Sequence, residues 1–465
     1  MSYENMTAKA PAPSTNAVSL PYFDDPCRLY RRLRHLGEAV LLDSGGDTVR
    51  GRFDIVAAQA DVSRSLFIEA NCTKSDMRRA LSQWQDLAER QITTTSSQCA
   101  LPFYGGYIGH FSYELGRRLQ NMPAAKAGTL PIAVAHYYPW AIVQDRQQQQ
   151  SWLVGEATAI EEAYPILHRL ITEEAAAPTQ MEFQLQQKFA HHWSLSDYQQ
   201  RFKKVQGYIS TGDCYQINIG QAFSAPFAGD LFCAYQKLRS IARAPFSAFF
   251  PLGEDQSLLC LSPERFLTVD QSSVETRPIK GTRPRHSDPA EDRLAAEALL
   301  ASDKERAENL MIVDLLRNDI GRFCEPGSVR AKELFTLESY STVHHLVSVV
   351  TGELSSKHSV LDLLLGCMPG GSITGAPKHR AMQIIDELEP ASRQAWCGSL
   401  FYVSRHGRLD SNITIRTLFN EGSQLHCWAG GGLVYDSQLE AEYQEQLDKV
   451  GAFLRALESD SNTIQ

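Results

Sequence analysis

The sequence predicts an α+β fold. Short runs of apolar and β-branched residues, which are typical of strands, occur in groups along the chain. Segments with helical periodicity lie between these groups, and strands and helices do not alternate one by one. Strict alternation would favour a parallel sheet, whereas grouped strands with segregated helices favour the α+β class.

The composition is that of a globular protein without a membrane or nucleic-acid partner. The chain has 465 residues, enough for one large domain or two medium ones, and 43% of them are apolar. The ten cysteines form no CxxC pair and no cluster with zinc spacing, which indicates reduced thiols. No apolar run reaches about 18 residues and no secretion signal is found, so we expect a cytoplasmic protein. The net charge of -9 disfavours nucleic acid and anionic membranes.

The sequence divides into four predicted regions. Residues 1–19 are rich in Ala, Pro, Ser, Thr and Asn and are expected to be disordered. Residues 20–171 form an N-terminal structured region, residues 172–193 a linker with little periodicity, and residues 194–458 a second structured region. The expected elements of the first region are a helix from residue 27, strands at 39–42, 53–58, 104–111 and 132–143, a hairpin tip at 146–151, and a helix at 161–171.

Capping patterns mark the helices of the second region. Ser194 with Asp197, and Ser302 with Glu305, predict capping boxes at the starts of two helices. The other expected elements are strands at 214–223, 248–250, 258–261 and 266–269, strands near 329 and at 346–351, a helix from 360, a loop at 369–378, two strands containing Tyr402 and Arg416, and a helix from 437.

The segment TRPIKGTR at residues 276–283 carries the first candidate catalytic residue. Pro278 fixes its own φ and favours an extended residue before it, and Gly281 allows close backbone approach. Lys280 is therefore expected at a strand end or a tight turn. An amine held rigidly is suited to covalent chemistry when its surroundings activate it. A solvated turn residue is the alternative that this segment alone leaves open.

Two predicted helices each carry glutamates three residues apart. Glu305 and Glu308 lie on one helix, and Glu442 and Glu445 lie on the last helix beside an apolar stripe. Partly buried glutamates from two helices could hold Mg²⁺, which accepts one or two carboxylates and completes its shell with water and ligand oxygens. The alternatives are a surface ion pair of Glu445 with Lys449 and a capping role for Glu305.

Glu264 and the loop at residues 369–378 are further candidates. Glu264 borders a predicted strand, where it is either a functional carboxylate or an exposed partner of Arg265. The loop does not match a phosphate-binding P-loop, because two residues separate Gly375 from Lys378 and no Ser or Thr follows the lysine. Its successive backbone N–H groups either bind an anion or form an ordinary tight loop.

A series of segments resembles, in order along the chain, the chorismate-utilising enzymes of the anthranilate synthase component I family. These segments are residues 210–218, 261–266, 277–282, 304–322, 344–348, 369–378, 398–404, 412–417, 429–432 and 442–450. The N-terminal region resembles the family more loosely, at residues 41–46 and 51–56. The resemblance implies large antiparallel sheets that form a two-layer β core, with helices packed outside.

Two positions distinguish branches of this family. At the centre of the PIxGT motif, anthranilate-forming relatives carry alanine and aminodeoxychorismate-forming relatives carry lysine, which here is Lys280. Gln216 stands where isochorismate-forming and salicylate-forming relatives carry a lysine that activates water. The resemblance therefore implies amination of chorismate at C4 to give 4-amino-4-deoxychorismate, in para-aminobenzoate and folate biosynthesis. Amination at C2 to give anthranilate, and a non-catalytic regulatory subunit that binds a small molecule, are the alternatives.

The resemblance also implies roles for single residues. Lys280 is expected to form a covalent adduct at C2 of chorismate, and Glu264 is expected to be the general acid for the departing 4-hydroxyl. Mg²⁺ is the expected cofactor. Its expected ligands are Glu308 and Glu445, with Glu305 and Glu442 beside them. The expected substrate-binding residues are Tyr402, Arg416, Gly431, Lys449, Thr374, Gly375, His345 and Gln216.

Two further partners are implied in the same way. The sequence has no Cys/His arrangement that resembles the family's glutaminase, so ammonia is expected from a separate glutamine amidotransferase subunit in a heterodimer. The N-terminal region is expected to bind tryptophan, in either a structural or a regulatory role. The expected tryptophan-binding residues are Ser44, Arg50, Gly51, Arg52, Phe53, Pro245, Phe246 and Ser247.

Overall fold

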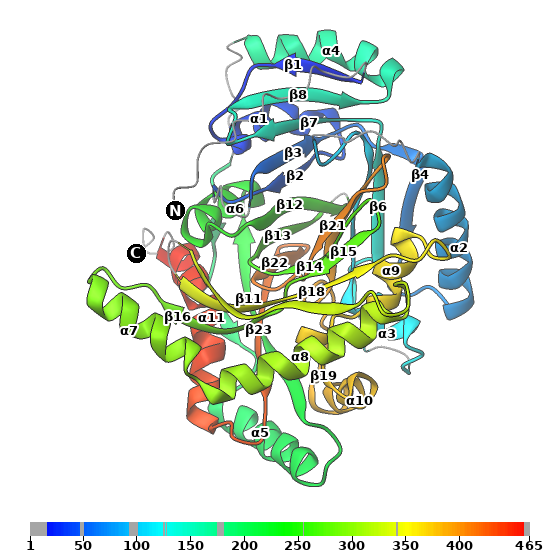
Figure 1. Ribbon diagram of the computed structural model, residues 1–465. Helices are drawn as coiled ribbons and strands as arrows, with labels where there is room; N and C mark the ends of the chain where they lie inside the picture. The colour runs from blue at the N-terminus through cyan, green and yellow to red at the C-terminus, as the bar shows by residue number, and fades with distance from the viewer. Residues whose placement is uncertain are drawn as a thin grey trace.

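The strands form two large antiparallel sheets with helices around them (Figure 1). The computed structural model describes residues 16–46, 51–92, 101–123, 126, 128–173, 181–253, 255–340 and 343–459. Every strand pairing within these residues is antiparallel. The fold is therefore α+β, as the sequence predicted.

The first sheet has 13 strands and combines both ends of the chain. Its order is β1 (Ala17–Leu20), β8 (Gln150–Gly155), β7 (Trp140–Asp145), β3 (Phe53–Ala57), β2 (Val40–Asp43), β12 (Phe246–Gly253), β13 (Gln256–Ser262), β22 (Thr417–Glu421), β23 (Gln424–Leu433), β11 (Gln216–Ala228) and β10 (Ala190–His191). Two short strands, β9 (Gln184–Leu185) and β19 (Gly375–Ala376), pair with β11 off this path.

The second sheet has 10 strands and also mixes early and late parts of the chain. Its order is β16 (Ile279–Pro284), β18 (Val343–Glu353), β15 (Ser273–Thr276), β14 (Arg265–Asp270), β21 (Leu409–Asn412), β20 (Ser399–Ser404), β5 (Gly106–Phe111), β6 (Ala133–Tyr138) and β4 (Asp61–Ile68), and β17 (Arg330–Ser339) pairs with β18.

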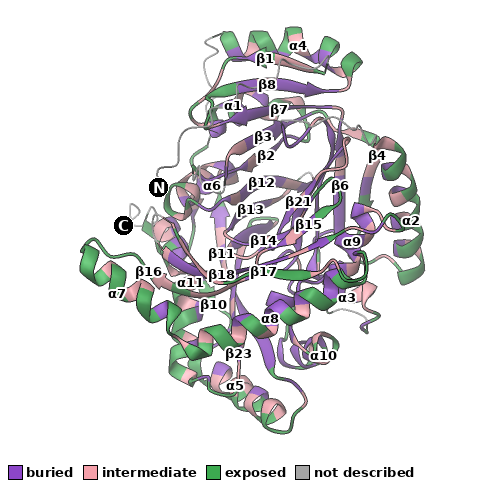
Figure 2. Cartoon of the chain, viewed as in Figure 1, coloured by how far each residue is buried: buried purple, intermediate pink, exposed green. Residues whose placement is uncertain are grey.

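Helices cover the outside of the sheets. They are α1 (Pro26–Leu33), α2 (Lys74–Gln91), α3 (Tyr113–Leu119), α4 (Ala157–Thr172), α5 (Leu195–Ser210), α6 (Leu231–Ala242), α7 (Pro289–Leu300), α8 (Asp303–Gly321), α9 (Val360–Cys367), α10 (Lys378–Leu388) and α11 (Leu439–Glu458). In Figure 2 the strands are largely buried, whereas α2, α4, α5 and α7 have exposed outer faces. No helix in the described ranges is both long and apolar enough to cross a bilayer.

Alternate residues of the first sheet face two different cores. Val40 of β2 belongs to the core between the two sheets, which also contains Tyr107 of β5. The next residue, Leu41, belongs to the core under the helices, together with Tyr235 of α6 and Leu454 of α11. Successive side chains of a strand point to opposite faces, so one sheet can serve both cores. The expected two-layer β core with helices outside is confirmed.

One of the two predicted capping boxes forms. At α5, Ser194 and Asp197 cap each other's backbone N–H groups, as predicted. At α8, Ser302 Oγ accepts a hydrogen bond from the N–H of Glu305, but the N–H of Ser302 donates to a backbone carbonyl. The Glu305 carboxylate therefore does not complete a box. It lies 3.6 Å from a guanidinium nitrogen of Arg283 instead.

Lys280 is the second residue of β16, in agreement with its expected place at a strand end, and the strand bulges between Lys280 and Thr282, where Gly281 has a φ of 75°. Two other local predictions are wrong. Arg416 lies before β22 and not in a strand, because its φ is 50°. Disorder of residues 1–19 is wrong at its end, since β1 pairs with β8; the first 15 residues lie outside the described ranges.

The expected linker at residues 172–193 contributes β9 and β10, which both pair with β11. Residues 174–180 lie outside the described ranges. Strands of the two predicted regions share both sheets, so the regions pack into common cores. The boundaries of these regions stay a prediction.

Candidate active site

A cavity of about 760 Å³ lies where α8 and α11 meet β16 and β23. Figure 1 shows α8 crossing the lower part of the molecule beside α11. The predicted site residues that line this cavity are Glu264, Lys280, Glu305, Glu308, His345, Arg416, Gly431, Glu442, Glu445 and Lys449. Residues more than 160 positions apart in the chain are thus brought to one space, including the lysine of β16 and the glutamates of both helices.

Lys280 is placed by the bulge in β16. It pairs with Leu346 of β18, and the register shifts at the next residue. A Cβ atom on Gly281 would lie 2.7 Å from Leu299 Cδ1 and 2.9 Å from Glu305 Oε2. The positive φ of Gly281 favours glycine here, and side chains from the end of α7 and the start of α8 pack against it. The close approach brings the lysine and the first glutamate of α8 to the same wall of the cavity.

Glu264 is a buried carboxyl group, with 7% of its surface exposed. Ser372 Oγ donates a hydrogen bond to its Oε1 at 2.7 Å. Burial raises the pKa of Glu264, and the contrary effects of the Ser372 hydrogen bond, Lys280 and Lys449 are smaller. A carboxyl group with a raised pKa can donate a proton near neutral pH. The exposed pairing with Arg265 is excluded, because Arg265 binds Asp410 at 3.0 Å.

Glu308 and Glu442 face each other from α8 and α11 with an ammonium group between them. Lys304 Nζ lies 3.9 Å from Glu308 Oε1 and 3.1 Å from Glu442 Oε1. Ser437 Oγ also donates to Glu442 Oε1, at 2.7 Å. Burial raises the pKa of Glu308 to about 7, and the neighbouring charges of Glu305 and Glu442 add to this rise. The cavity therefore holds negative charge that a cation would neutralise.

Glu445 and Lys449 form an ion pair of 2.7 Å along α11, and both line the cavity. Burial tends to raise the pKa of Glu445, but the charges of Lys449, Lys304 and Lys280 outweigh it, so the pKa is lowered. Lys449 Nζ also donates to the carbonyl of Gly430 at 3.0 Å. The predicted surface pair thus exists, and it lies at the cavity wall.

Arg416 and His345 also line the cavity. Burial lowers the pKa of Arg416, and within the described residues its guanidinium has no carboxylate partner within 4 Å. His345 Nδ1 is 2.9 Å from Thr282 Oγ1, and burial together with Arg416 lowers its pKa to about 3. The imidazole is therefore neutral at physiological pH. The guanidinium is a cation prepared for an anionic ligand.

Four predicted substrate-binding residues do not line this cavity. Tyr402 lies in a different cavity, described below. Thr374 is buried and donates from its hydroxyl to the carbonyl of Gly370 at 3.0 Å. Gly375 and Gln216 belong to the paired strands β19 and β11. Gln216 lies behind the wall, because a Cβ on Gly432 would be 2.4 Å from its Nε2.

Several cavity residues were not predicted as site residues. Ser372 lies in a short turn at Gly371–Ile373, within the loop that the sequence analysis treated as an anion cradle. Trp396 and Trp428 stack with ring centroids 5.4 Å apart and both line the cavity. Lys304 could have been found from the sequence, because it lies in the first turn of a predicted helix, where a cation is unfavourable unless it has another role.

A second cavity, of about 240 Å³, lies at the junction of β2, β12 and β20. The expected tryptophan-binding residues that line it are Gly51, Arg52, Phe53, Pro245, Phe246 and Ser247, and Tyr402 lines it too. Arg50 lies outside the described residues. The guanidinium of Arg52 binds Asp145 at 2.9 Å and lies 4.8 Å from the ring centroid of Phe53.

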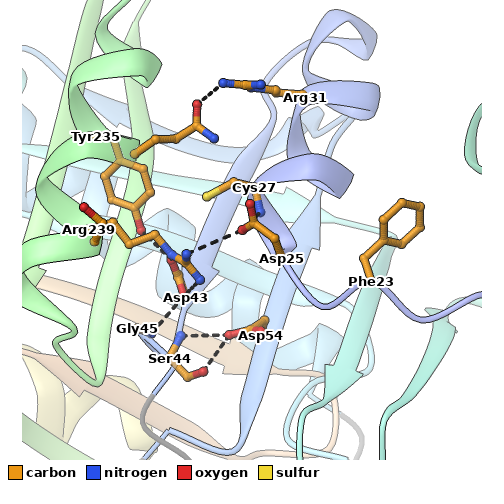
Figure 3. Close-up of polar contacts among 12 residues, drawn as sticks. Phe23, Asp25, Cys27, Arg31, Asp43, Ser44, Gly45, Asp54, Tyr235 and Arg239 are labelled. Atoms are coloured by element: carbon orange, nitrogen blue, oxygen red, sulfur yellow. Dashed lines mark hydrogen bonds and ion pairs between the residues drawn. The ribbon is translucent and has the colours of Figure 1, made fainter. Parts of the chain in front are cut away.

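Ser44 is not among the residues that line the second cavity, so its expected role stays a prediction. Its hydroxyl and its backbone N–H both donate to Asp54 Oδ1, at 2.7 and 2.8 Å (Figure 3). The neighbouring Asp43 does line the cavity, but Arg239 and Tyr235 bind its carboxylate. Ser44 is therefore part of a buried polar network that fixes the end of β2.

A family model described as chorismate binding enzyme matches residues 37–455 of this chain. The chain belongs to the chorismate-binding enzymes. It is 43% identical over 457 residues to aminodeoxychorismate synthase component 1 of Salmonella typhimurium, and the alignment covers 96% of this chain and 99% of that protein. It is also 43% identical over 455 residues to the protein of the same name from Escherichia coli, with 96% and 99% covered.

The solved structures support the same fold for this chorismate-binding enzyme. Anthranilate synthase component I from Streptococcus pneumoniae superimposes with a TM-score of 0.72 at 26% identity, covering 98% of this chain and 95% of that one.

A divalent cation fits the glutamates only with help from other ligands. Within the described ranges, no three His, Cys, Asp or Glu side chains are grouped closely enough to hold a metal ion. Mg²⁺ needs only one or two carboxylates when water and ligand oxygens complete its shell. The ammonium of Lys304 between Glu308 and Glu442 marks a place that favours positive charge. The residues therefore fit a metal ion shared with an anionic substrate.

Proposed function

We propose that this chorismate-binding enzyme aminates chorismate at C4 to give 4-amino-4-deoxychorismate. The observation that carries this proposal is that Lys280 and Glu264 line one cavity with four glutamates from α8 and α11. Relatives named aminodeoxychorismate synthase component 1, at 43% identity over nearly their whole length, support the same activity.

The substrate is a dianion, and the cavity offers cations and N–H groups to hold it. The guanidinium of Arg416 can bind one carboxylate in a bidentate manner. The ammonium of Lys449 lies close to the backbone at Gly431, since a Cβ on Gly431 would be 3.5 Å from Lys449 Nζ. The neutral imidazole of His345 adds a hydrogen-bonding group without charge.

Glu308 and Glu445 would hold Mg²⁺, with Glu305 and Glu442 beside them. When bound, Mg²⁺ would neutralise the ring carboxylate and make the ring more electrophilic. The stacked indoles of Trp396 and Trp428 give the same cavity an apolar wall.

In the proposed reaction, the side-chain amine of Lys280 attacks C2, and both ring double bonds shift towards C4 as the C4–oxygen bond breaks. Glu264 gives its proton to the departing hydroxyl, which leaves as water. Ammonia then forms a bond to C4 and passes a proton to Glu264, both ring double bonds shift back, and the amine of Lys280 leaves C2. The overall exchange is one ammonia gained and one water lost.

Ammonia is proposed to come from a separate glutamine amidotransferase in a heterodimer. The word component in the names of the relatives supports an enzyme of more than one subunit. A cytoplasmic location is proposed as well. None of the nine cysteines in the described ranges forms a disulfide, which fits a reducing compartment.

The test is to incubate the purified chain with chorismate, ammonium and Mg²⁺ and to identify the product by mass and by the position of amination. We expect C4 amination, and we expect Lys280→Ala to abolish or divert it. Amination at C2 would favour anthranilate formation, and absence of turnover with intact chorismate binding would favour a regulatory subunit. Full C4 amination by Lys280→Ala would remove the covalent step.

Tryptophan is the proposed occupant of the second cavity. A volume of about 240 Å³ is smaller than drug-sized pockets of about 300–1,000 Å³, so it suits one amino acid. Thermal unfolding with and without tryptophan tests this. A rise in Tm that Phe246→Ala removes would support the site, and equal Tm values would contradict it. An effect of tryptophan on turnover would distinguish a regulatory role from a structural one.

A further inference from the structure

We propose that Lys304 is a built-in competitor for the divalent cation: its ammonium fills the space between the carboxylates of α8 and α11 and has to leave when a metal ion binds. This inference rests on the proposed function, because it concerns the metal site of that reaction. It assigns Lys304 as a positioning residue that controls when the metal enters.

The geometry places Lys304 between the two helices. Its ammonium contacts Glu442 Oε1 at 3.1 Å, across 138 residues of sequence, and lies 3.9 Å from Glu308 Oε1 on its own helix. All three side chains line the cavity. The carboxylates of Glu308 and Glu442 are 12% and 6% exposed, so solvent neutralises little of their charge. When no metal is bound, Lys304 is therefore the ion-pair partner of Glu442, and it shares the neutralisation of Glu308 with Lys280.

The position of Lys304 on α8 favours this role over a structural one. Ser302 caps the helix, so Lys304 is in its first turn. The N-terminus of a helix carries partial positive charge, which disfavours a lysine there. A lysine kept only to stabilise α8 would be expected near its other end. The interaction that stabilises Lys304 in this position must therefore come from outside α8, and it is the contact with Glu442 of α11.

An ammonium and a metal ion cannot share this space. Mg²⁺ binds carboxylate oxygens at about 2.0–2.1 Å, whereas an ammonium holds them at about 2.8–3 Å. A metal ion held by Glu308, with Glu442 beside it, would have the ammonium in its immediate surroundings, where two cations repel each other in a buried site. Metal binding therefore requires the lysine to move away.

The side chain of Lys304 has somewhere to go. It is 42% exposed, and four flexible carbons carry its ammonium, so it can swing into solvent without moving α8. A dianionic substrate adds negative charge beside the glutamates and favours a divalent ion over a single ammonium. Lys304 thus makes metal binding weak in the empty enzyme and stronger once substrate is present.

The test is calorimetric titration of the full chain with Mg²⁺ alone, comparing wild type with Lys304→Met. We expect the variant to bind Mg²⁺ at least about tenfold more tightly, since a competing charge is lost. We also expect its Tm without metal to be lower and the rise in Tm on adding Mg²⁺ to be larger. Lys304→Gln serves as a second variant should the methionine variant not fold.

Two controls make the result specific. Lys304→Arg keeps the charge and should bind Mg²⁺ as weakly as wild type. Lys203→Met removes a charge from the exposed face of α5 and should change nothing. Equal or weaker Mg²⁺ binding by Lys304→Met would overturn the inference while leaving the metal site in place. Absence of Mg²⁺ binding by both proteins, even with chorismate present, would overturn the metal site and the inference together.

Discussion

Ser372 donates a hydrogen bond to Glu264 at 2.7 Å, inside the cavity that Lys280 also lines. The loop that carries Ser372 therefore affects the acidity of the Glu264 carboxyl group. The same loop also contributes β19, whose backbone pairs with β11. A hydrogen bond to a carboxylate stabilises its charged form, so Ser372 opposes the rise in pKa that burial causes.

Ser372→Ala should move the basic limb of the kcat–pH profile to higher pH. Loss of the hydrogen bond raises the pKa of Glu264 further, and a general acid stays protonated, and active, up to its pKa. We also expect kcat at the optimum to fall about tenfold, because the carboxyl group is held less firmly. Ser372→Thr keeps the hydroxyl and should retain the wild-type profile. A limb that moves to lower pH would contradict this account.

Glu308→Gln should stabilise the metal-free enzyme at pH 8 but not at pH 4.5. The pKa of Glu308 is about 7 in the folded state, above its ordinary value of 4.5. Between these two values the folded protein keeps a proton that the unfolded protein has lost, so the free energy of unfolding falls as the pH rises from 4.5 to 7. The wild type therefore loses up to about 3 kcal/mol over this range, and the neutral amide does not. Urea unfolding in EDTA measures this. Glu440→Gln, on the exposed start of α11, is the control and should show no such difference.

Arg416→Met should raise the stability of the free enzyme while weakening substrate binding. The guanidinium is partly buried and has no carboxylate partner in the described residues, so its removal should stabilise the fold by up to about 1 kcal/mol. Loss of a bidentate contact to a carboxylate should raise KM for chorismate about 30-fold. Thermal unfolding checks the rise in stability, and steady-state kinetics on the same preparation checks the rise in KM. Lower stability with unchanged KM would show that Arg416 is structural.

Neighbouring glycines of β23 should respond differently to alanine. A Cβ on Gly431 would meet Lys449 Nζ at 3.5 Å, an ordinary contact, so Gly431→Ala should fold and raise KM by narrowing the cavity. A Cβ on Gly430 would lie 2.5 Å from the carbonyl oxygen of Ile219 and 2.7 Å from Trp396 Cη2. Gly430→Ala should therefore cost at least about 2 kcal/mol of folding free energy, measured by urea unfolding. Equal effects on folding would contradict this distinction.

Residues with a local pattern could be predicted from the sequence. Ser194 and Asp197 cap α5 because a capping box needs only four consecutive residues. The glutamates at a spacing of three residues reach one cavity because helical periodicity puts each pair on one face. The α+β class followed in the same way from the grouping of apolar runs.

Positions that depend on distant neighbours could not be predicted. Tyr402 and Trp396 are six residues apart, and only the path of the chain around β20 decides that the indole lines the main cavity and the phenol the second one. The pairing of Lys280 with Leu346 of β18 was not predicted, because the sequence gives no sign that these two strands meet. Lys304 gains its role from Glu442, which is 138 positions away.

The middle of the first sheet is made late. β22 and β23 lie between β13 and β11, yet they come from residues after 416 of a 465-residue chain. A chain still emerging from the ribosome has β13 and β11 with bare edges that only the last strands can cover, and such edges promote aggregation. The nascent protein is therefore not protected until β22 and β23 have been made, so a premature stop before Thr417 should leave insoluble material and not a weakened enzyme.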